Sequence, residues 1–475
     1  MQTTRWRSAI MLTYLVIGVL FAVYTPAWQA PDEPAHYNYI HFVAVQGALP
    51  VLQAGDYNQA EQTAAIAARF GSGATIESFR YEFHQPPLYY LLAAPIFRLT
   101  GGALLPLRLF SVFLGSLLLL VIYRGASLIA PPAIALGAMA FVAFLPMHVA
   151  IMASVNNDGL AELLIALLLW QCLRLLQQPS SPSLRPWAWL GITAGLGLIT
   201  KSTVYGLLPM LGAALLLAWR DRLRHNPHDR QSARVIFAAA LPLLLLALPW
   251  WLRNLAVYGG ADFLGLNRHE DIVLGQLRTS EFLAQEGWTG LGNRFFTWTF
   301  RSFWGQFGWM SVVLDSRIYT GLLILSLAAS VGAGWTLWRA WPQRVHRRSL
   351  LILALAMLGA AGGYLWYNLS FVQHQGRYLF PALLPIALSL SAGLVGLAQP
   401  GASRLAAALA AGALCLSLIA APDRWTLLLW AAAIVLLALL PRLQRWHALL
   451  YRGVFAGLAG LCLVSLFWFI APQLR

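Results

Sequence analysis

Long apolar runs alternate with short polar segments along most of the chain, and the length of these runs is typical of membrane-spanning helices. A helix needs about 20 apolar residues to cross the hydrocarbon core, and tilted or protein-buried spans depart from that length. About thirteen such runs can be marked off, and the pattern therefore predicts an all-α bundle that crosses a membrane many times. The runs are 8–28, 105–123, 132–153, 158–176, 187–200, 203–219, 235–253, 318–338, 350–369, 379–397, 404–420, 425–440 and 453–471.

Composition agrees with a membrane protein. Hydrophobic residues make up 59% of the 475 residues and charged residues only 10%, whereas a soluble domain carries roughly a quarter charged residues. One protein core cannot bury so much apolar surface, so lipid is its natural solvent. The cysteines Cys172, Cys415 and Cys462 all lie inside apolar runs and offer neither metal-binding spacing nor a disulfide framework. The first apolar run lacks a small-residue cleavage site and is expected to be a retained helix.

The formal net charge of +15 comes from basic residues scattered in short clusters between apolar runs. This distribution is typical of cytoplasmic loops and does not indicate nucleic-acid binding. The clusters fall in alternate loops, which places the N-terminus in the cytoplasm and the C-terminus outside by the positive-inside rule. They comprise Arg5, Arg7, Arg124, Arg174, Arg185, Arg220, Arg222, Arg224, Arg230, Arg234, Arg339, Arg344, Arg347, Arg348, Arg404, Arg442, Arg445 and Arg452.

Two long segments, 29–104 and 258–317, then fall on the outer side. Each contains an amphipathic stretch, 87–99 in the first and 295–307 in the second, that predicts a helix lying on the membrane surface. Aromatic residues are dense between 288 and 309. Membrane anchoring explains this density better than stacking on a ligand.

Acidic residues number only 17 with glutamate and aspartate combined, so their positions are informative. Asp32 and Glu33 stand between Pro31 and Pro34, directly after the first apolar run. A stiffly held carboxylate pair at the membrane surface could take a proton from a hydroxyl or hold a divalent cation against a phosphate. It could equally cap a helix that starts near Ala35. The two interpretations are compatible.

Two further polar motifs also lie outside. Glu82 and His84 precede Pro86 and Pro87 at the start of a predicted helix, whose N-terminus would attract anions, although an ordinary loop-to-helix junction explains the pattern as well. Asp158 lies in a tight polar turn and is expected to cap the next helix. Glu162 follows one turn later, so close to the hydrocarbon that a paired or functional role is favoured.

Three cations at the outer ends of helices run against the charge bias. They are Lys201, Arg253 and Arg377. Snorkelling to the interface would explain them, as would binding of a lipid phosphate. Taken together, carboxylates and cations from separate loops are predicted to meet at the outer mouth of one helix bundle.

These motifs resemble those of the GT-C glycosyltransferases, polytopic enzymes that use polyprenyl-phosphate-linked sugars. The chain is similar in particular to bacterial members of the protein O-mannosyltransferase and lipid A aminoarabinose transferase branch. The resemblance covers the chain from its start to about Pro385. It rests on Asp32-Glu33-Pro34, on His84-Gln85-Pro86-Pro87-Leu88-Tyr89-Tyr90, on Asn157-Asp158, on Leu198-Ile199-Thr200-Lys201, on Pro249-Trp250 with Arg253-Asn254 and Tyr258-Gly259, and on Gln375-Gly376-Arg377-Tyr378.

The resemblance implies that a sugar moves, with inversion, from a polyprenyl-phosphate donor to an acceptor hydroxyl at the outer face of the cell membrane. It implies a general base at Asp32, with Glu33 and Asp158 as further catalytic candidates. It assigns Lys201, Arg253, Arg377 and His84 to the donor phosphate, and His36, Tyr89, Asn157 and Tyr378 to the substrate. One departure concerns His84-Gln85, where relatives often carry a Glu-Lys or similar charged pair that contacts the phosphate or a metal.

The resemblance also divides the chain into a catalytic transmembrane module, 1–397, which includes both outer segments, and C-terminal transmembrane helices, 398–475. Relatives often carry a soluble outer domain after the last helices, and since this chain shows none, acceptor recognition is expected from the outer segments. The expected partners are the lipid-linked sugar, the bilayer and an acceptor glycan, lipid or protein. A divalent cation, Mg²⁺ or Mn²⁺, is compatible with the carboxylates, and no other cofactor is expected. The rival class is a transporter or flippase of a lipid-linked saccharide, but no internal repeat or broken helix pair is evident in the sequence.

Overall fold

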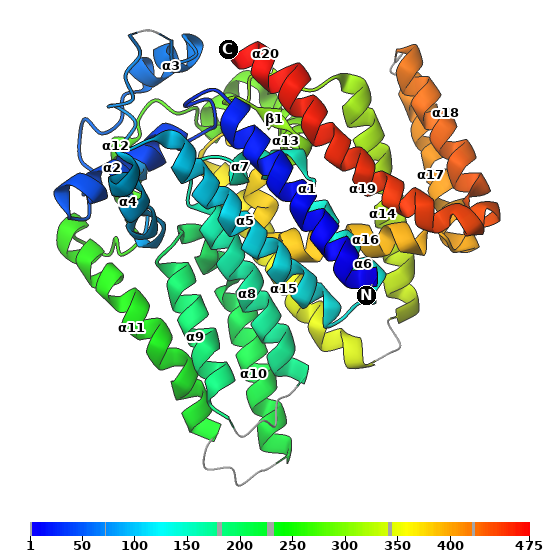
Figure 1. Ribbon diagram of the computed structural model, residues 1–475, viewed down its shortest axis with the longest axis horizontal. Helices are drawn as coiled ribbons and strands as arrows, with labels where there is room; N and C mark the ends of the chain where they lie inside the picture. The colour runs from blue at the N-terminus through cyan, green and yellow to red at the C-terminus, as the bar shows by residue number, and fades with distance from the viewer. Residues whose placement is uncertain (1, 72, 178–182, 226–231, 341–343, 420–422) are drawn as a thin grey trace.

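The computed structural model describes residues 2–71, 73–177, 183–225, 232–340, 344–419 and 423–475, and helices account for nearly all of its regular structure (Figure 1). The long apolar runs form α1 (Gln2–Tyr24), α5 (Leu104–Ser127), α6 (Pro132–Ala143), α7 (Pro146–Met152), α8 (Asp158–Gln177), α9 (Arg185–Leu198), α10 (Leu208–His225), α11 (Ser232–Tyr258), α14 (Ser316–Ala340), α15 (Arg344–Ser370), α16 (Leu383–Gly396), α17 (Pro400–Ile419), α18 (Arg424–Leu439) and α19 (His447–Val464).

Shorter elements form the outer segments and the turns between helices. The first outer segment contains α2 (Glu33–Gln46), α3 (Gln59–Ala67), the 3₁₀ turn η1 (Tyr81–His84) and α4 (Leu88–Thr100). The second contains α12 (Leu266–Ile272), α13 (Thr279–Trp304) and an antiparallel pair of two-residue strands, β1 (Gln306–Phe307) and β2 (Val312–Val313). The remaining elements are η2 (Ser202–Leu207), η3 (Gly376–Ala382), η4 (Leu440–Trp446), η5 (Ser465–Ile470) and α20 (Ala471–Leu474).

The number of membrane spans is lower than the predicted thirteen. Within the described residues ten helices are long and apolar enough to cross a membrane, or eleven if the bent pair α6 and α7 is one span. Each of the thirteen predicted runs contains a helix within the described residues, but α9 has only 14 residues and is too short to count as a span. In addition, residues 424–474 count once although they bend at η4. Figure 1 shows α18 and α19 as separate arms of this stretch.

A break between α6 and α7 contradicts the expectation that no span is broken. The two helices meet at an angle of 62°, and Pro146 stands in the first turn of α7. Proline lacks an N–H group and clashes with the preceding turn, so it ends α6 inside an otherwise continuous apolar run. The break lets the His148 Nδ1 contact the Val142 carbonyl at 2.9 Å, and its Nε2 meets Glu162 Oε2 at 3.0 Å. Glu162 is therefore paired and buried, as its position near the hydrocarbon predicts.

The outer segments gather at one end of the helix bundle. In Figure 1 α2, α3, α12, α13 and β1 occupy the upper part of the view, where the C-terminus also lies, and the N-terminus lies lower down. The helices below these segments in the view pack closely against one another. A Cβ at Gly191 of α9 would lie 2.0 Å from the Ala239 carbonyl oxygen of α11, so only glycine lets these two backbones approach so closely.

Candidate active site

Asp32 occupies the N-cap position of α2 but does not use its side chain as a cap. Its backbone is left-handed, with φ 66°, and its side chain makes no capping bond. Instead, Tyr81 donates its hydroxyl to Asp32 Oδ1 at 2.8 Å, and Arg377 donates to Oδ2 at 2.5 Å. A positive φ is unfavourable for a residue with a Cβ and persists only where the surroundings enforce it. The cap position thus aims the carboxylate away from its own helix.

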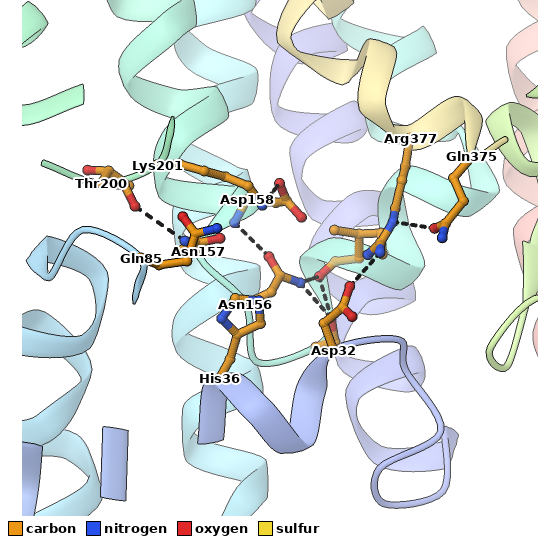
Figure 2. Close-up of polar contacts among 12 residues, drawn as sticks. Asp32, His36, Gln85, Asn156, Asn157, Asp158, Thr200, Lys201, Gln375 and Arg377 are labelled. Atoms are coloured by element: carbon orange, nitrogen blue, oxygen red, sulfur yellow. Dashed lines mark hydrogen bonds and ion pairs between the residues drawn. The ribbon is translucent and has the colours of Figure 1, made fainter. Parts of the chain in front are cut away.

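Asp158 and Lys201 form a second ion pair. Lys201 Nζ lies 2.6 Å from Asp158 Oδ1. Asp158 is the first residue of α8, and its backbone N–H donates to Asn156 Oδ1 at 2.9 Å. Lys201 follows α9 and precedes η2. Figure 2 shows this pair and the Asp32–Arg377 pair close together, each formed by residues far apart in the sequence.

Both pairs face one cavity of about 610 Å³. Seven residues predicted for the site line this cavity, which makes it the place where the separate motifs meet. They are Asp32, His36, His84, Asp158, Lys201, Arg377 and Tyr378. The opposite wall is mostly apolar and comes largely from α15 and the segment before α12. It includes Leu264, Leu266, Leu358, Gly359, Ala360, Gly362, Gly363 and Trp366.

Glu33 does not line the cavity. Its side chain is fully buried against Arg108 of α5, which donates Nε to Oε1 at 2.8 Å and Nη2 to Oε2 at 2.6 Å. Backbone N–H groups of Val155 and Trp28 complete its bonds. Arg108 also donates to three carbonyls at the end of α1, so the pair joins α1, α2 and α5. A buried ion pair whose oxygens are all bonded holds structure together.

Three other predicted residues lie outside the cavity lining. Arg253 donates to the Pro50 carbonyl and, at 3.0 Å, to Asn254 Oδ1. Tyr89 is buried with its hydroxyl 3.2 Å from Ser111 Oγ. Asn157 donates to the Tyr90 hydroxyl at 3.4 Å and to the Thr200 carbonyl at 3.3 Å. Since the Tyr90 hydroxyl lies 2.8 Å from His36 Nδ1, Asn157 supports the cavity wall from behind.

The structure adds residues that the sequence did not single out. Tyr81 holds Asp32, and Gln375 Oε1 accepts from Arg377 Nε at 2.8 Å. Gln375 stands inside the motif Gln375-Gly376-Arg377-Tyr378, and Tyr81 directly precedes Glu82, so each position lay next to a residue already singled out. His269 of α12 also lines the cavity, with its ring centroid 4.5 Å from that of His84. Nothing in the local sequence marks it, because its partner lies in the other outer segment.

Burial and the ion pairs set the charges in the cavity. Burial raises the pKa of Asp32, but the charge and hydrogen bond of Arg377 outweigh it, so the pKa lies below its usual value. Burial, with the neighbouring Asp32 carboxylate, raises the pKa of Glu82. Burial lowers the pKa of His36 and brings that of His84 to about 4. At neutral pH Asp32 is therefore an anion beside neutral imidazoles.

The donor set does not fit a resident divalent cation at the acidic residues. Within the part of the chain that the structure describes, no group of three or more histidine, cysteine, aspartate or glutamate residues could hold a metal ion. Asp32 and Asp158 each already face a cation. No step is therefore assigned to Mg²⁺ or Mn²⁺.

Fold and cavity define a polytopic helical membrane protein whose outer segments close over a charged cavity. Residues 53–387, most of the chain, match the family model described as "Predicted membrane protein (DUF2142)", and the chain belongs to this family. No curated protein matches it.

The chain is similar to several solved structures. ArnT from Cupriavidus metallidurans in the apo state has 16% identity and a TM-score of 0.50, over 100% of this chain and 77% of that chain. The same protein bound to undecaprenyl phosphate has 15% identity and a TM-score of 0.49, over 98% and 77%. The Archaeoglobus fulgidus oligosaccharyltransferase tethered with an acceptor peptide has 14% identity and a TM-score of 0.47, over 94% and 55%. The likeness to apo ArnT confirms the GT-C fold that the motifs implied.

Proposed function

We propose that this protein is a membrane glycosyltransferase that moves a sugar from a polyprenyl-phosphate donor to an acceptor hydroxyl, with inversion at the anomeric carbon. The observation that carries this proposal is the convergence of two carboxylate–cation pairs on one cavity. Their members come from the start of α2, the start of α8, the α9–η2 turn and η3. Such a set can bind an anionic group and accept a proton in the same place.

The apolar wall supports a lipid-linked donor. Leu358 and Trp366 of α15 line the cavity and are also largely exposed on the outside of the bundle. An isoprenoid chain could lie along this wall while its phosphate approaches Lys201 and Arg377. Guanidinium and ammonium groups bind phosphate oxygens strongly, and a mostly apolar pocket with a few placed charges is typical of such ligands.

In the proposed mechanism Asp32 is the general base. The acceptor oxygen attacks the anomeric carbon while Asp32 takes its proton, and the bond from that carbon to the phosphate oxygen breaks. Lys201 and Arg377 stabilise the charge that develops on the leaving lipid phosphate. Because protonation of Asp32 removes its attraction for Arg377, the guanidinium becomes free for the phosphate as the reaction proceeds. Asp158 orients Lys201 through their ion pair. Glu33 holds the start of α2 against α1 and α5 through Arg108.

The proposed location of the reaction is the outer face of the cell membrane. The basic clusters support this orientation, since the positive-inside rule places the loops that carry them in the cytoplasm. The cavity is formed by η1, η2, η3 and the segment around α12, at the end of the bundle where the outer segments gather (Figure 1).

A second candidate function is transport of a lipid-linked saccharide across the membrane. The observation that favours it is the broken pair α6 and α7, because broken helices are common in transporters. A transporter exposes its site to the two sides in turn, whereas the proposed enzyme needs access from the outer side alone.

The test compares the protein with its Asp32→Asn variant in lipid nanodiscs, using a panel of radiolabelled polyprenyl-phosphate sugars and an envelope fraction as acceptor. Undecaprenyl phosphate is the first carrier to try. Asp271→Asn, an exposed residue of α12, is the matched control for the loss of one carboxylate. Label transfer with release of lipid phosphate, lost in Asp32→Asn and kept in the control, supports the enzyme and its base.

Two other outcomes separate the alternatives. Turnover that persists unchanged in Asp32→Asn keeps the enzyme and removes Asp32 as the base. Donor binding without transfer across the whole panel, joined with movement of the lipid between leaflets in proteoliposomes, favours the transporter.

A further inference from the structure

One short turn brings three hydrogen-bond acceptors to the wall of the cavity. Glu82 and His84 belong to η1, and Gln85 follows it directly. All three residues line the cavity, beside the residues of the two ion pairs. The acceptors are the Glu82 carboxylate, His84 Nε2 and Gln85 Oε1.

The tautomer of His84 follows from its neighbour. His84 Nδ1 lies 2.9 Å from the Tyr81 carbonyl oxygen. A carbonyl oxygen can only accept, so Nδ1 carries the proton and Nε2 presents a lone pair. The Gln85 amide donates to this Nε2 at 3.4 Å, a weak contact. That orientation leaves Gln85 Oε1 buried without a hydrogen-bond partner.

Glu82 differs from the other acidic residues of the cavity. Asp32 faces Arg377 and Asp158 faces Lys201, but the ion pairs of the described residues include none to Glu82. Glu82 is partly exposed, but Gln85 Oε1 is withdrawn from water without a partner, which is unfavourable by about 1–3 kcal/mol. Three acceptors in one turn that lack strong protein donors therefore fit a ligand rich in donors.

The turn and the two cations line the same cavity but differ in charge. The phosphate of a lipid donor is anionic, so Lys201 and Arg377 attract it and the Glu82 carboxylate repels it. The turn carries Glu82, His84 and Gln85 and contains no lysine or arginine of its own. All of these residues line one cavity, and Lys201 acts electrostatically on Glu82 and His84, so a donor with its phosphate at Lys201 has its sugar within reach of η1.

We propose that residues 82–85 form the binding site for the sugar of the lipid-linked donor, and that this site takes a group rich in hydrogen-bond donors. Neighbouring hydroxyls of a neutral sugar and the ammonium of an amino sugar both supply such donors. The inference rests on the proposed function and adds the residues that select the sugar. His269 of α12 lines the same cavity, with its ring tilted by 50° against that of His84.

The test measures binding of four synthetic probes to the protein in nanodiscs. They are undecaprenyl phosphate alone and the same carrier with a hexose, with the hexose in which one hydroxyl is an amine, or with the corresponding deoxyhexose. Glu82→Gln removes the charge, and Gln85→Leu removes Oε1 at similar size. Glu61→Gln is the matched control, because Glu61 stands in the first turn of α3 and is exposed.

We expect Glu82→Gln and Gln85→Leu to bind the carrier alone as the unaltered protein does, which also shows that they fold. Each should bind a sugar-bearing carrier about tenfold more weakly, equivalent to about 1.4 kcal/mol. If the site takes an ammonium, the amino sugar binds best and Glu82→Gln removes that preference. If it takes hydroxyls, the neutral hexose binds best and the deoxyhexose loses affinity.

Two results would overturn the inference and they are distinguishable. If the carrier alone binds and the sugar changes nothing in any variant relative to Glu61→Gln, the sugar site is wrong while the proposed function stands. If neither the carrier nor any sugar-bearing carrier binds the unaltered protein, the proposed function fails and the sugar site fails with it.

Discussion

Asp32 and Glu33 are neighbours in the sequence with opposite surroundings. Asp32 faces the cavity with 24% of its side chain exposed, whereas the Glu33 side chain is fully buried against Arg108. The change of direction occurs because Asp32 is left-handed and Glu33 begins α2. One residue can therefore serve the reaction while the next supports the loop.

Removing the charge of Glu33 should destabilise the protein. Glu33→Gln leaves the Arg108 guanidinium buried without its anion, and breaking such a pair is unfavourable by about 3–5 kcal/mol. We expect a clearly lower thermal unfolding midpoint in detergent, measured by intrinsic fluorescence. Asp32→Asn, at a partly exposed position, should shift the midpoint much less. Equal midpoints for both variants would contradict a structural role of Glu33.

The pH dependence of transfer should depend on Arg377. Arg377 lowers the pKa of Asp32, so the base stays ionised at mildly acidic pH and is lost only as pH falls below its usual value. In Arg377→Gln the effect of burial remains and raises the pKa of Asp32, which moves the acidic limb of kcat/KM to higher pH. Arg377→Lys keeps a positive charge and should leave the limb near its original place. A limb that does not move in Arg377→Gln would exclude Asp32 as the titrating base.

At the scale of elements, the small residues of α15 shape the apolar wall. Gly359, Ala360, Gly362 and Gly363 lie on the cavity side of this helix. A Cβ at Gly362 or Gly363 meets no atom within 4 Å, so bulkier side chains at these two positions would fill the space that the proposed isoprenoid chain uses. The apolar run by itself predicted a spanning helix, but it did not show which of its faces borders a cavity.

Gly362→Leu should weaken lipid binding without unfolding the protein. A Cβ at Gly362 meets no atom within 4 Å, so the added side chain projects into open space beside the cavity. We expect KM for the lipid donor to rise about tenfold, equivalent to about 1.4 kcal/mol, with an unchanged unfolding midpoint. Gly334→Leu on α14 is the control, since a Cβ there also meets nothing within 4 Å and Gly334 does not line the cavity. An equal KM in both variants would remove α15 from the donor site.

At the scale of the whole molecule, α3 lies in the upper part of the view in Figure 1 and the end of α10 lies in the lower part. The positive-inside rule places α3 outside and the end of α10 in the cytoplasm. The fold alone does not distinguish this orientation from its inverse.

Cysteine labelling in intact cells tests the orientation. With Cys415→Ser removing the exposed native thiol, Gln59→Cys on α3 should react with a membrane-impermeant maleimide from outside. Arg224→Cys on α10 should react only after the cells are permeabilised. Arg224 is exposed and Gln59 is partly exposed in the structure. The reverse pattern would place the cavity on the cytoplasmic side and contradict the proposed location.

The sequence by itself determined the class of protein and much of the cavity. Apolar run length predicts helices because the backbone must satisfy its hydrogen bonds within the membrane. Asp32, Asp158, Lys201 and Arg377 were recognisable because acidic residues are scarce and outer cations oppose the charge bias. Their common lining of one cavity agrees with the predicted convergence, while their chemical roles stay predictions.

Only the tertiary structure decided how neighbouring polar residues divide between the cavity and the scaffold. Glu33 turns inward because Arg108, 75 positions later, provides its partner. His269 reaches the cavity because α12 folds back onto η1. Pro146 breaks a span that apolar run length alone counts as continuous. In each case the decisive interaction joins residues far apart in the sequence or depends on the exact path of the backbone, and neither local composition nor periodicity records such contacts.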